Sequence, residues 1–147
     1  MYGKTERLKT MTRSLWLNLP VKDLAKSKEF FTKLGFSFNK GHGSTEFSEC
    51  LLIGEKNTVV MLFTETVFQG FTKHEITDAS LTTEVLISID AGSKEEVDEL
   101  AKKAAEAGGT VFSAPGGNDF MYGCGFADLD AHRWNVLFMD MSKIQNG

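Results

Sequence analysis

The chain carries the same predicted order of secondary structure twice. A strand-like run at 15–21 leads into a helix from Asp23 to Leu34, and three further strand-like runs follow. The second half repeats this order at an offset of 68 residues, beginning with a strand at 85–90. A lone four-stranded sheet with one helix leaves one face bare. The sequence therefore predicts two βαβββ modules that pair and enclose a cleft between them.

Local signals support each predicted element. Asp23 and Ser93 stand at helix starts, with Glu96 completing a capping box, and Gly35 and Gly108 supply the helix exits. The remaining strands are predicted from apolar alternation and flanking turn residues, at 36–39, 47–53, 58–64, 110–113, 123–128 and 133–139.

Composition restricts the classes of protein that the chain can represent. The 147 residues are 41% hydrophobic with a net charge of −4, which argues against a nucleic-acid-binding face. No apolar run reaches the roughly 20 residues of a membrane span. The two cysteines lack metal or disulfide spacing, which is typical of reduced thiols, so we expect a cytoplasmic protein.

The termini and the connections carry separate expectations. We expect a flexible N-terminal arm at 1–14, with Met1 or Met11 as the start, and a C-terminal tail at 141–147. A single domain is expected at 15–140, made of modules at about 15–65 and 83–140. The linker at 66–82 is interpreted as a packed crossover or as a flap over the cleft, and the loop at 116–122 as a second candidate lid.

Two segments carry a resemblance to a known family. Residues 21–36, VKDLAKSKEFFTKLGF, and 126–134, FADLDAHRW, occur in the order and spacing found in the vicinal oxygen chelate superfamily. This superfamily includes glyoxalase I, extradiol dioxygenases and bleomycin-resistance proteins, and the chain is similar to its glyoxalase-related bacterial members of undefined substrate. The resemblance implies an α+β fold, a cup-shaped mixed sheet with helices outside, and a homodimer.

The resemblance also implies where a metal would bind. In metal-using members the ligands project into the cup from the first and last strand of each module, at positions that correspond here to Trp16, Met61, Glu84 and Asn135. Zinc, nickel and iron sites need several imidazole, thiolate or carboxylate donors. A shift in register that places Asn18 instead of Trp16 at the first position still supplies no histidine, so the metal ligands remain incomplete. We therefore expect no metal site and no cofactor.

Glu84 is the candidate catalytic residue, because a carboxylate in an apolar cup becomes a general base when desolvation raises its proton affinity. The alternative is a structural ion pair with Arg133. His132 is a candidate proton donor at the rim of the cup. The expected ligand-binding residues share a predicted place around the cup and are Trp16, Asn18, Met61, Phe63, Tyr122, Arg133 and Asn135.

Three functions remain open from the sequence. The first is a protein that binds a small organic molecule in an apolar cup without a metal. The second is an enzyme, either a lyase or dioxygenase that recruits Ni, Zn, Fe or Mn through other ligands, or a metal-free isomerase with Glu84 as base. The third is a purely structural module whose cup is filled by side chains.

Overall fold

The computed structural model describes residues 11–144. Most of the expected N-terminal arm, with Met1, lies outside the described residues, as do 145–147. Residues 11–14 form no regular element and are exposed. Where a tail was expected, Met141–Ile144 form a short helix, α4.

The first module is a four-stranded mixed sheet with helix α1, Leu24–Lys33, packed on one face. Its strand order is β1-β4-β3-β2, with β1 parallel to β4 and the other neighbours antiparallel. The strands are β1 Leu17–Val21, β2 Ser37–Phe38, β3 Ser48–Ile53 and β4 Thr58–Thr64. Helix α2, Glu65–Thr72, follows β4 directly.

The second module repeats this topology around helix α3, Lys94–Glu106, with strand order β5-β8-β7-β6. Its strands are β5 Leu86–Asp90, β6 Thr110–Gly117, β7 Met121–Ala127 and β8 Arg133–Met139. These sheets confirm the predicted α+β class and the paired βαβββ modules. The expected lid at 116–122 is instead the end of the β6–β7 hairpin, where the Asn118 side chain accepts hydrogen bonds from two backbone N–H groups.

The predicted helix caps are present. Asp23 accepts a hydrogen bond from the Lys26 N–H at 3.0 Å, and Ser93 accepts one from the Glu96 N–H at 3.1 Å. Each cap satisfies a backbone donor that the first helical turn leaves without a partner. Gly35 has a φ of 101°, in the left-handed region where a side chain is strained.

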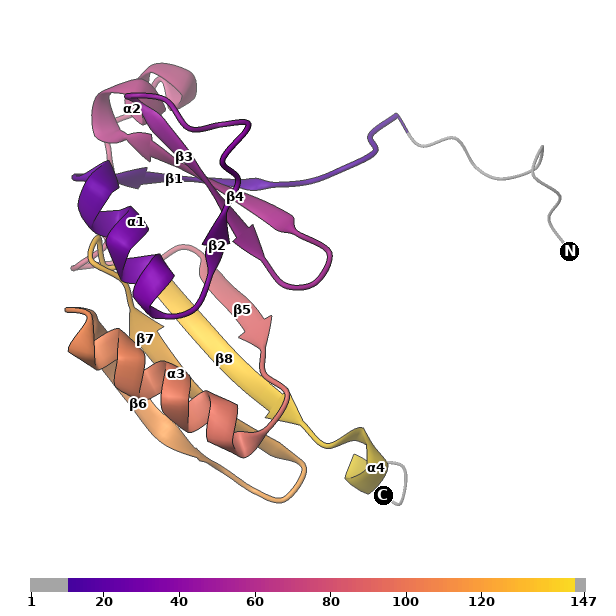
Figure 1. Ribbon diagram of the computed structural model, residues 1–147. Coiled ribbons are helices and arrows are strands. Elements are labelled where there is room, and N and C mark those ends of the chain that lie inside the picture. Colours follow the sequence, from indigo (N-terminus) through magenta and orange to yellow (C-terminus); the bar gives the residue numbers. More distant parts are fainter. Residues whose placement is uncertain (1–10, 145–147) are drawn as a thin grey trace, which may run out of the picture.

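One hydrophobic core joins the two modules (Figure 1). Helix α1 contributes Phe30 and Phe31, whose rings contact Phe126 on β7 and Trp134 on β8 at centroid distances of 6.2 and 5.4 Å. All four residues are almost fully buried. In Figure 1, α1 and α3 lie next to each other beside the two sheets. The modules are therefore packed together through their helix-covered faces.

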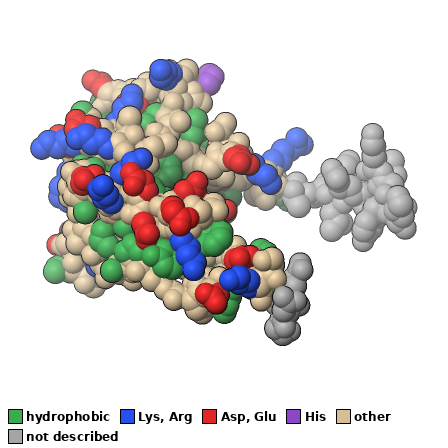
Figure 2. Space-filling model, turned by 60° about the horizontal axis from the view of Figure 1, so that its bottom comes forward, with side chains coloured by type: hydrophobic (Ala, Val, Ile, Leu, Met, Phe, Trp, Pro, Cys, Tyr) green, Lys and Arg blue, Asp and Glu red, His purple; other side chains and the backbone are tan. Residues whose placement is uncertain are grey.

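The surface of the molecule carries charges of both signs. Figure 2 shows basic and acidic side chains mixed over one face, with apolar side chains between them. Ion pairs such as Lys33–Glu29 and Lys103–Glu99 hold some of these charges along the helices. Among residues 11–144, no helix has the length and hydropathy that crossing a membrane requires.

Candidate functional site

The turn between β7 and β8 is organised by one buried carboxylate. Asp128 accepts hydrogen bonds from the backbone N–H groups of Asp130 and His132, and from the indole N–H of Trp134, each at 3.0 Å. Ala131 takes up a left-handed conformation, with a φ of 66°, to complete the turn. Burial raises the pKa of the Asp128 carboxyl, while the nearby His132 and these donors act in the opposite direction.

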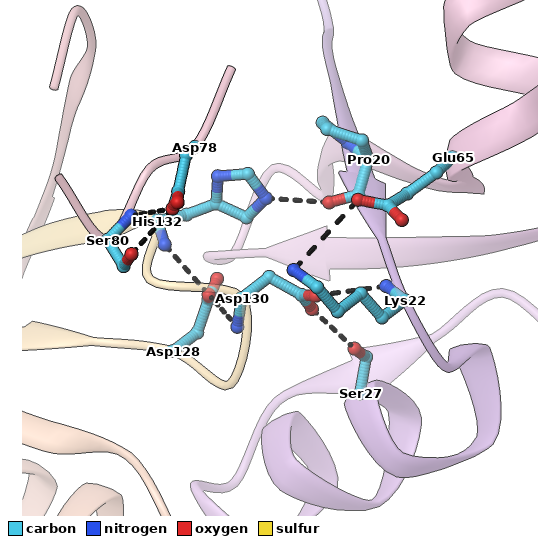
Figure 3. A network of polar contacts seen from close by, with 9 residues as sticks. All are labelled: Pro20, Lys22, Ser27, Glu65, Asp78, Ser80, Asp128, Asp130 and His132. Carbon is cyan, nitrogen blue, oxygen red and sulfur yellow. Dashed lines mark hydrogen bonds and ion pairs between the residues drawn. The ribbon is translucent and has the colours of Figure 1, made fainter. Parts of the chain in front are cut away.

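This turn attaches the second module to the first (Figure 3). The Asp130 carboxylate accepts hydrogen bonds from the Lys22 backbone N–H at 2.9 Å and from the Ser27 hydroxyl at 3.3 Å. His132 Nε2 lies 2.7 Å from the Pro20 carbonyl oxygen. Because a carbonyl oxygen only accepts, Nε2 carries the hydrogen in this contact. The turn therefore ties the end of β1 and the start of α1 to the second module.

A pocket of about 360 Å³ opens at this junction between the modules. Its walls come from β1, the end of α2, the connection 73–85, the start of β5 and the turn that holds His132. Leu19, Phe68 and Ile87 supply apolar surface. Charged and polar side chains stand among them, and these include Asn18, His74, Glu75, Glu84, His132 and Arg133.

The pocket brings together only some of the predicted site residues. Asn18, Glu84 and Arg133 line it, together with His132. Trp16 lies before β1 and is 53% exposed, and Asn135 donates a hydrogen bond to Ser88. Met61 and Phe63 are half-buried on β4. Tyr122 is placed elsewhere than expected, because its hydroxyl donates to Asp98 of α3 at 2.7 Å, on the helix-covered side.

Strand register shows which side chains lie side by side on the first and last strands of each module. β1 and β4 pair Asn18 with Met61, and β5 and β8 pair Ser88 with Asn135. The partners expected from the sequence, Trp16 and Glu84, both precede their strands. Leu62 and Val136 lie in the shared core, so alternation turns these four side chains toward the opposite face of each sheet.

The positions that the resemblance aligns with the metal ligands, Trp16, Met61, Glu84 and Asn135, do not fit a divalent transition metal. They offer an indole, a thioether, one carboxylate and an amide, whereas zinc, nickel and non-haem iron sites use several imidazole, thiolate or carboxylate ligands. In the described part of the chain, no three His, Cys, Asp or Glu side chains converge as a metal site would require. No chemical step is therefore assigned to a metal at this position.

Glu84 and Arg133 do not form the ion pair that was the structural alternative. None of the salt bridges among residues 11–144 includes either side chain. Glu84 is exposed at the pocket wall. Arg133 instead lies over the ring of Phe112, with its guanidinium carbon 4.1 Å from the ring centroid. Glu84 is thus available to a molecule in the pocket, whereas the guanidinium of Arg133 is held against Phe112.

Sequence reasoning interpreted the linker at 66–82 as a packed crossover or a flap over the cleft, but it named no linker residue as part of a pocket. Helix α2 places Phe68 and Thr72 in the pocket wall, and Phe71 contacts Phe63 of β4 edge to face at 5.1 Å. No signal in the sequence indicated that His74 and Glu75 line the pocket. The contact between His132 and Pro20 joins residues 112 positions apart, which no local pattern reveals.

Comparisons with known proteins agree with this architecture. A model of the bleomycin resistance protein-like N-terminal family matches residues 13–47. Among solved structures, the hypothetical protein SA1046 from S. aureus is 37% identical, with a TM-score of 0.77, over 87% of this chain and 95% of that one. A comparison with curated proteins found no match.

More distant structures share the fold. A glyoxalase/bleomycin resistance protein/dioxygenase family enzyme from Burkholderia phytofirmans PsJN is 17% identical, with a TM-score of 0.69, over 83% of this chain and 94% of that one. A glyoxalase-related enzyme from Fulvimarina pelagi is 16% identical, with a TM-score of 0.72, over 88% of each chain. The fold is that of the vicinal oxygen chelate superfamily. Within it, the chain belongs to the same family as the S. aureus protein.

Proposed function

We propose that the protein binds a small organic molecule in the junction pocket. The observation that carries this proposal is the pocket itself, whose volume of about 360 Å³ suits a small ligand. Apolar surface from Leu19, Phe68 and Ile87 provides the area that an organic molecule buries. The polar groups around it supply orientation, as is typical of ligand sites.

A ligand screen by thermal unfolding tests this function. A true ligand stabilises the folded protein by about 2.7 kcal/mol at a hundredfold excess over its dissociation constant. Ala79→Trp places an indole in the pocket wall and should abolish this shift, whereas Ala25→Trp, on the exposed face of α1, should preserve it. Stabilisation that survives Ala79→Trp would place the ligand elsewhere and contradict the proposal.

We propose further that binding needs no divalent metal. The support is the donor set of Trp16, Met61, Glu84 and Asn135, in which Glu84 is the one carboxylate and neither imidazole nor thiolate is present. Elemental analysis of untagged protein should find no stoichiometric Ni, Zn, Fe or Mn, and a chelator should leave the thermal unfolding midpoint unchanged. A stoichiometric metal that is lost in Glu84→Ala would support the metal-dependent lyase or dioxygenase instead.

A metal-free isomerase is the second candidate function. It is favoured by one observation, the presence of Glu84 and His132 in the same pocket wall, where a base and a proton donor are needed. Its signature is exchange of a carbon-bound proton of the bound ligand for solvent deuterium, followed by NMR. Glu84→Gln should stop this exchange and leave ligand affinity within a few-fold of the parent.

We propose that the protein is a homodimer and acts in the cytoplasm. The sheet face of the second module that points away from α3 exposes apolar side chains, with Leu86 54%, Met139 47% and Met121 40% exposed. A second copy that covers this face would remove them from water. Light scattering should give twice the chain mass, and Leu86→Glu should reduce it to that of a monomer. The cysteines of the described chain are free and buried, which suits a reducing compartment.

A further inference from the structure

The outer edge of β1 carries backbone groups that no strand of the described chain covers. Among residues 11–144, β1 pairs with β4 alone and ends its sheet. The backbone N–H and C=O of one residue leave a strand on the same edge, and successive residues alternate between the two edges. The Pro20 carbonyl points away from β4, because it accepts a hydrogen bond from His132 in the second module. Asn18 and Lys22, two residues to either side, therefore direct their backbone groups to the same outer edge.

The second module satisfies this edge only in part (Figure 3). The turn between β7 and β8 supplies His132 to the Pro20 carbonyl oxygen and Asp130 to the Lys22 N–H. Asn18 lies next along the edge, and within the described chain no hydrogen bond from outside its own sheet reaches its backbone. It is exposed and stands in the wall of the junction pocket. A strand edge that is left open in this way is a template for pairing with another extended molecule.

The space beside Asn18 suits a short molecule rather than a long strand. The contact between His132 and Pro20 closes the edge on one side, so a molecule paired with Asn18 cannot continue along β1 in that direction. The pocket volume of about 360 Å³ is that of a small-ligand site. Half-buried apolar side chains in the same wall can contact the rest of the molecule, and these are Leu19, Phe68 and Ile87.

We propose that the ligand of the junction pocket is a small peptide-like amide that pairs with the free backbone edge of β1 at Asn18. This inference rests on the proposed function and names its ligand class. The ligand N–H donates to the Asn18 carbonyl oxygen, and the ligand C=O accepts from the Asn18 N–H, as one residue of an added strand would do. The apolar part of the ligand packs on the surrounding side chains, which provide selectivity.

A series of capped amino acids tests the backbone pairing. The N-acetyl amides of leucine, valine and phenylalanine are each compared with the ester in which oxygen replaces the acetylated nitrogen, so that the shape is kept and one donor is lost. Binding is followed through the NMR signals of isotope-labelled protein. We expect at least one amide to bind saturably and at least about fivefold more tightly than its ester, because the ester leaves the Asn18 carbonyl oxygen without a donor.

Hydrogen exchange locates the contact on the protein. The bound amide should slow exchange of the Asn18 N–H by at least about tenfold, because a hydrogen-bonded N–H exchanges only when its bond opens. Glu46 lies in an exposed turn outside the pocket, and its N–H should exchange at the same rate with and without the amide.

Two substitutions at one position separate the backbone from the side chain. Asn18→Pro removes the N–H at a strand edge, where proline is tolerated, whereas Asn18→Ala removes the same side chain and keeps the N–H. The proline variant should bind the amide at least about fivefold more weakly than the alanine variant. An unchanged signal from the indole N–H of Trp134, which donates to Asp128 in the core, shows that both variants are folded. If proline disturbs the fold, the ester comparison and the exchange of Asn18 in the parent protein decide.

The outcomes separate this inference from the proposed function. Failure of every amide to bind, or equal binding of amides and esters, would overturn the inference. The proposed function would stand in that case if another ligand stabilises the parent protein but not Ala79→Trp. An amide that binds without slowing exchange at Asn18, or that binds Asn18→Pro and Asn18→Ala equally, would also overturn the inference.

Discussion

The imidazole Nε2 of His132, in the second module, donates a hydrogen bond to the backbone carbonyl oxygen of Pro20, in the first, at 2.7 Å. Asp130, two residues earlier, accepts from the backbone N–H of Lys22. One turn therefore both joins the modules and forms a wall of the pocket between them. Stability at this junction and ligand binding are expected to change together.

Replacing His132 should weaken the junction. His132→Leu leaves the partly buried Pro20 carbonyl without its donor, which should lower the free energy of unfolding by about 1 kcal/mol. Urea unfolding followed by circular dichroism measures the change. His42 lies in an exposed turn, and His42→Leu is the matched control with no expected effect. Equal losses in the two variants would contradict a specific role for the contact with Pro20.

Replacing Asp128 should destabilise the turn from within. In Asp128→Asn the amide can accept from the two backbone N–H groups only by directing its own NH₂ at the Trp134 indole N–H. This unmatched pair of buried donors should reduce the free energy of unfolding by about 1 to 3 kcal/mol. Asp119→Asn, at an exposed turn, should be neutral.

The deficit of Asp128→Asn should also depend on pH. Burial raises the pKa of Asp128 above its ordinary 3.8, so the folded chain holds this proton more tightly than the unfolded chain. The contribution of the Asp128 carboxyl to the free energy of unfolding therefore increases as the pH falls through its pKa in the folded state. It becomes constant once the pH is below the ordinary pKa of 3.8. Urea titrations at neutral and acidic pH should show a larger deficit in acid. A deficit that shrinks in acid would reverse the assigned direction of the shift.

Tyr122 should ionise at unusually high pH. The hydrogen bond from its hydroxyl to Asp98 raises the pKa of the phenol above 10.0, and desolvation adds to this. A raised pKa means that the protonated phenol stabilises the folded protein. This contribution is fully present below pH 10.0 and is lost as the pH rises through the pKa of Tyr122 in the folded state. In a Tyr2→Phe background Tyr122 is the sole tyrosine, so its phenolate absorbance can be titrated directly. Asp98→Asn should lower the pKa, and an unchanged titration would show that the hydrogen bond is not its cause.

Gly109 should not tolerate a side chain. A Cβ at this position would lie 2.7 Å from the Ala127 carbonyl oxygen and 2.9 Å from the Phe30 ring, in the contact between α1 and the second module. Gly109→Ala should therefore destabilise the fold by about 1 to 3 kcal/mol, as overpacked positions do. Gly70, in α2, has open space at its Cβ, and Gly70→Ala should be neutral or stabilising by up to about 1 kcal/mol. Urea unfolding of the two variants tests both expectations, and the midpoint should fall for Gly109→Ala and stay the same or rise for Gly70→Ala.

Local patterns predicted the elements well because caps and alternation act over a few residues. Asp23 and Ser93 begin their helices where expected, and β4 and β8 have the predicted bounds. The extent of the loop expected at 116–122 was wrong, because its glycines indicated irregular structure whereas backbone pairing between β6 and β7 continues to Gly117.

The site was less predictable, because register and contacts between distant segments decide it. A shift of two residues along β1 exchanges Trp16 for Asn18 without altering which face the side chains point to. Tyr122 is turned toward Asp98 by the same alternation that buries Cys124 and Phe126. Whether Arg133 pairs with Glu84 or stacks on Phe112 depends on rotamers and on a neighbouring strand, neither of which its own segment encodes.

The aromatic packing of Phe30 and Phe31 on Phe126 and Trp134 makes each half of the chain depend on the other. Either half alone would expose its rings to water. A half-chain expressed alone is accordingly expected to aggregate, and mixing the two separate halves should recover a folded heterodimer.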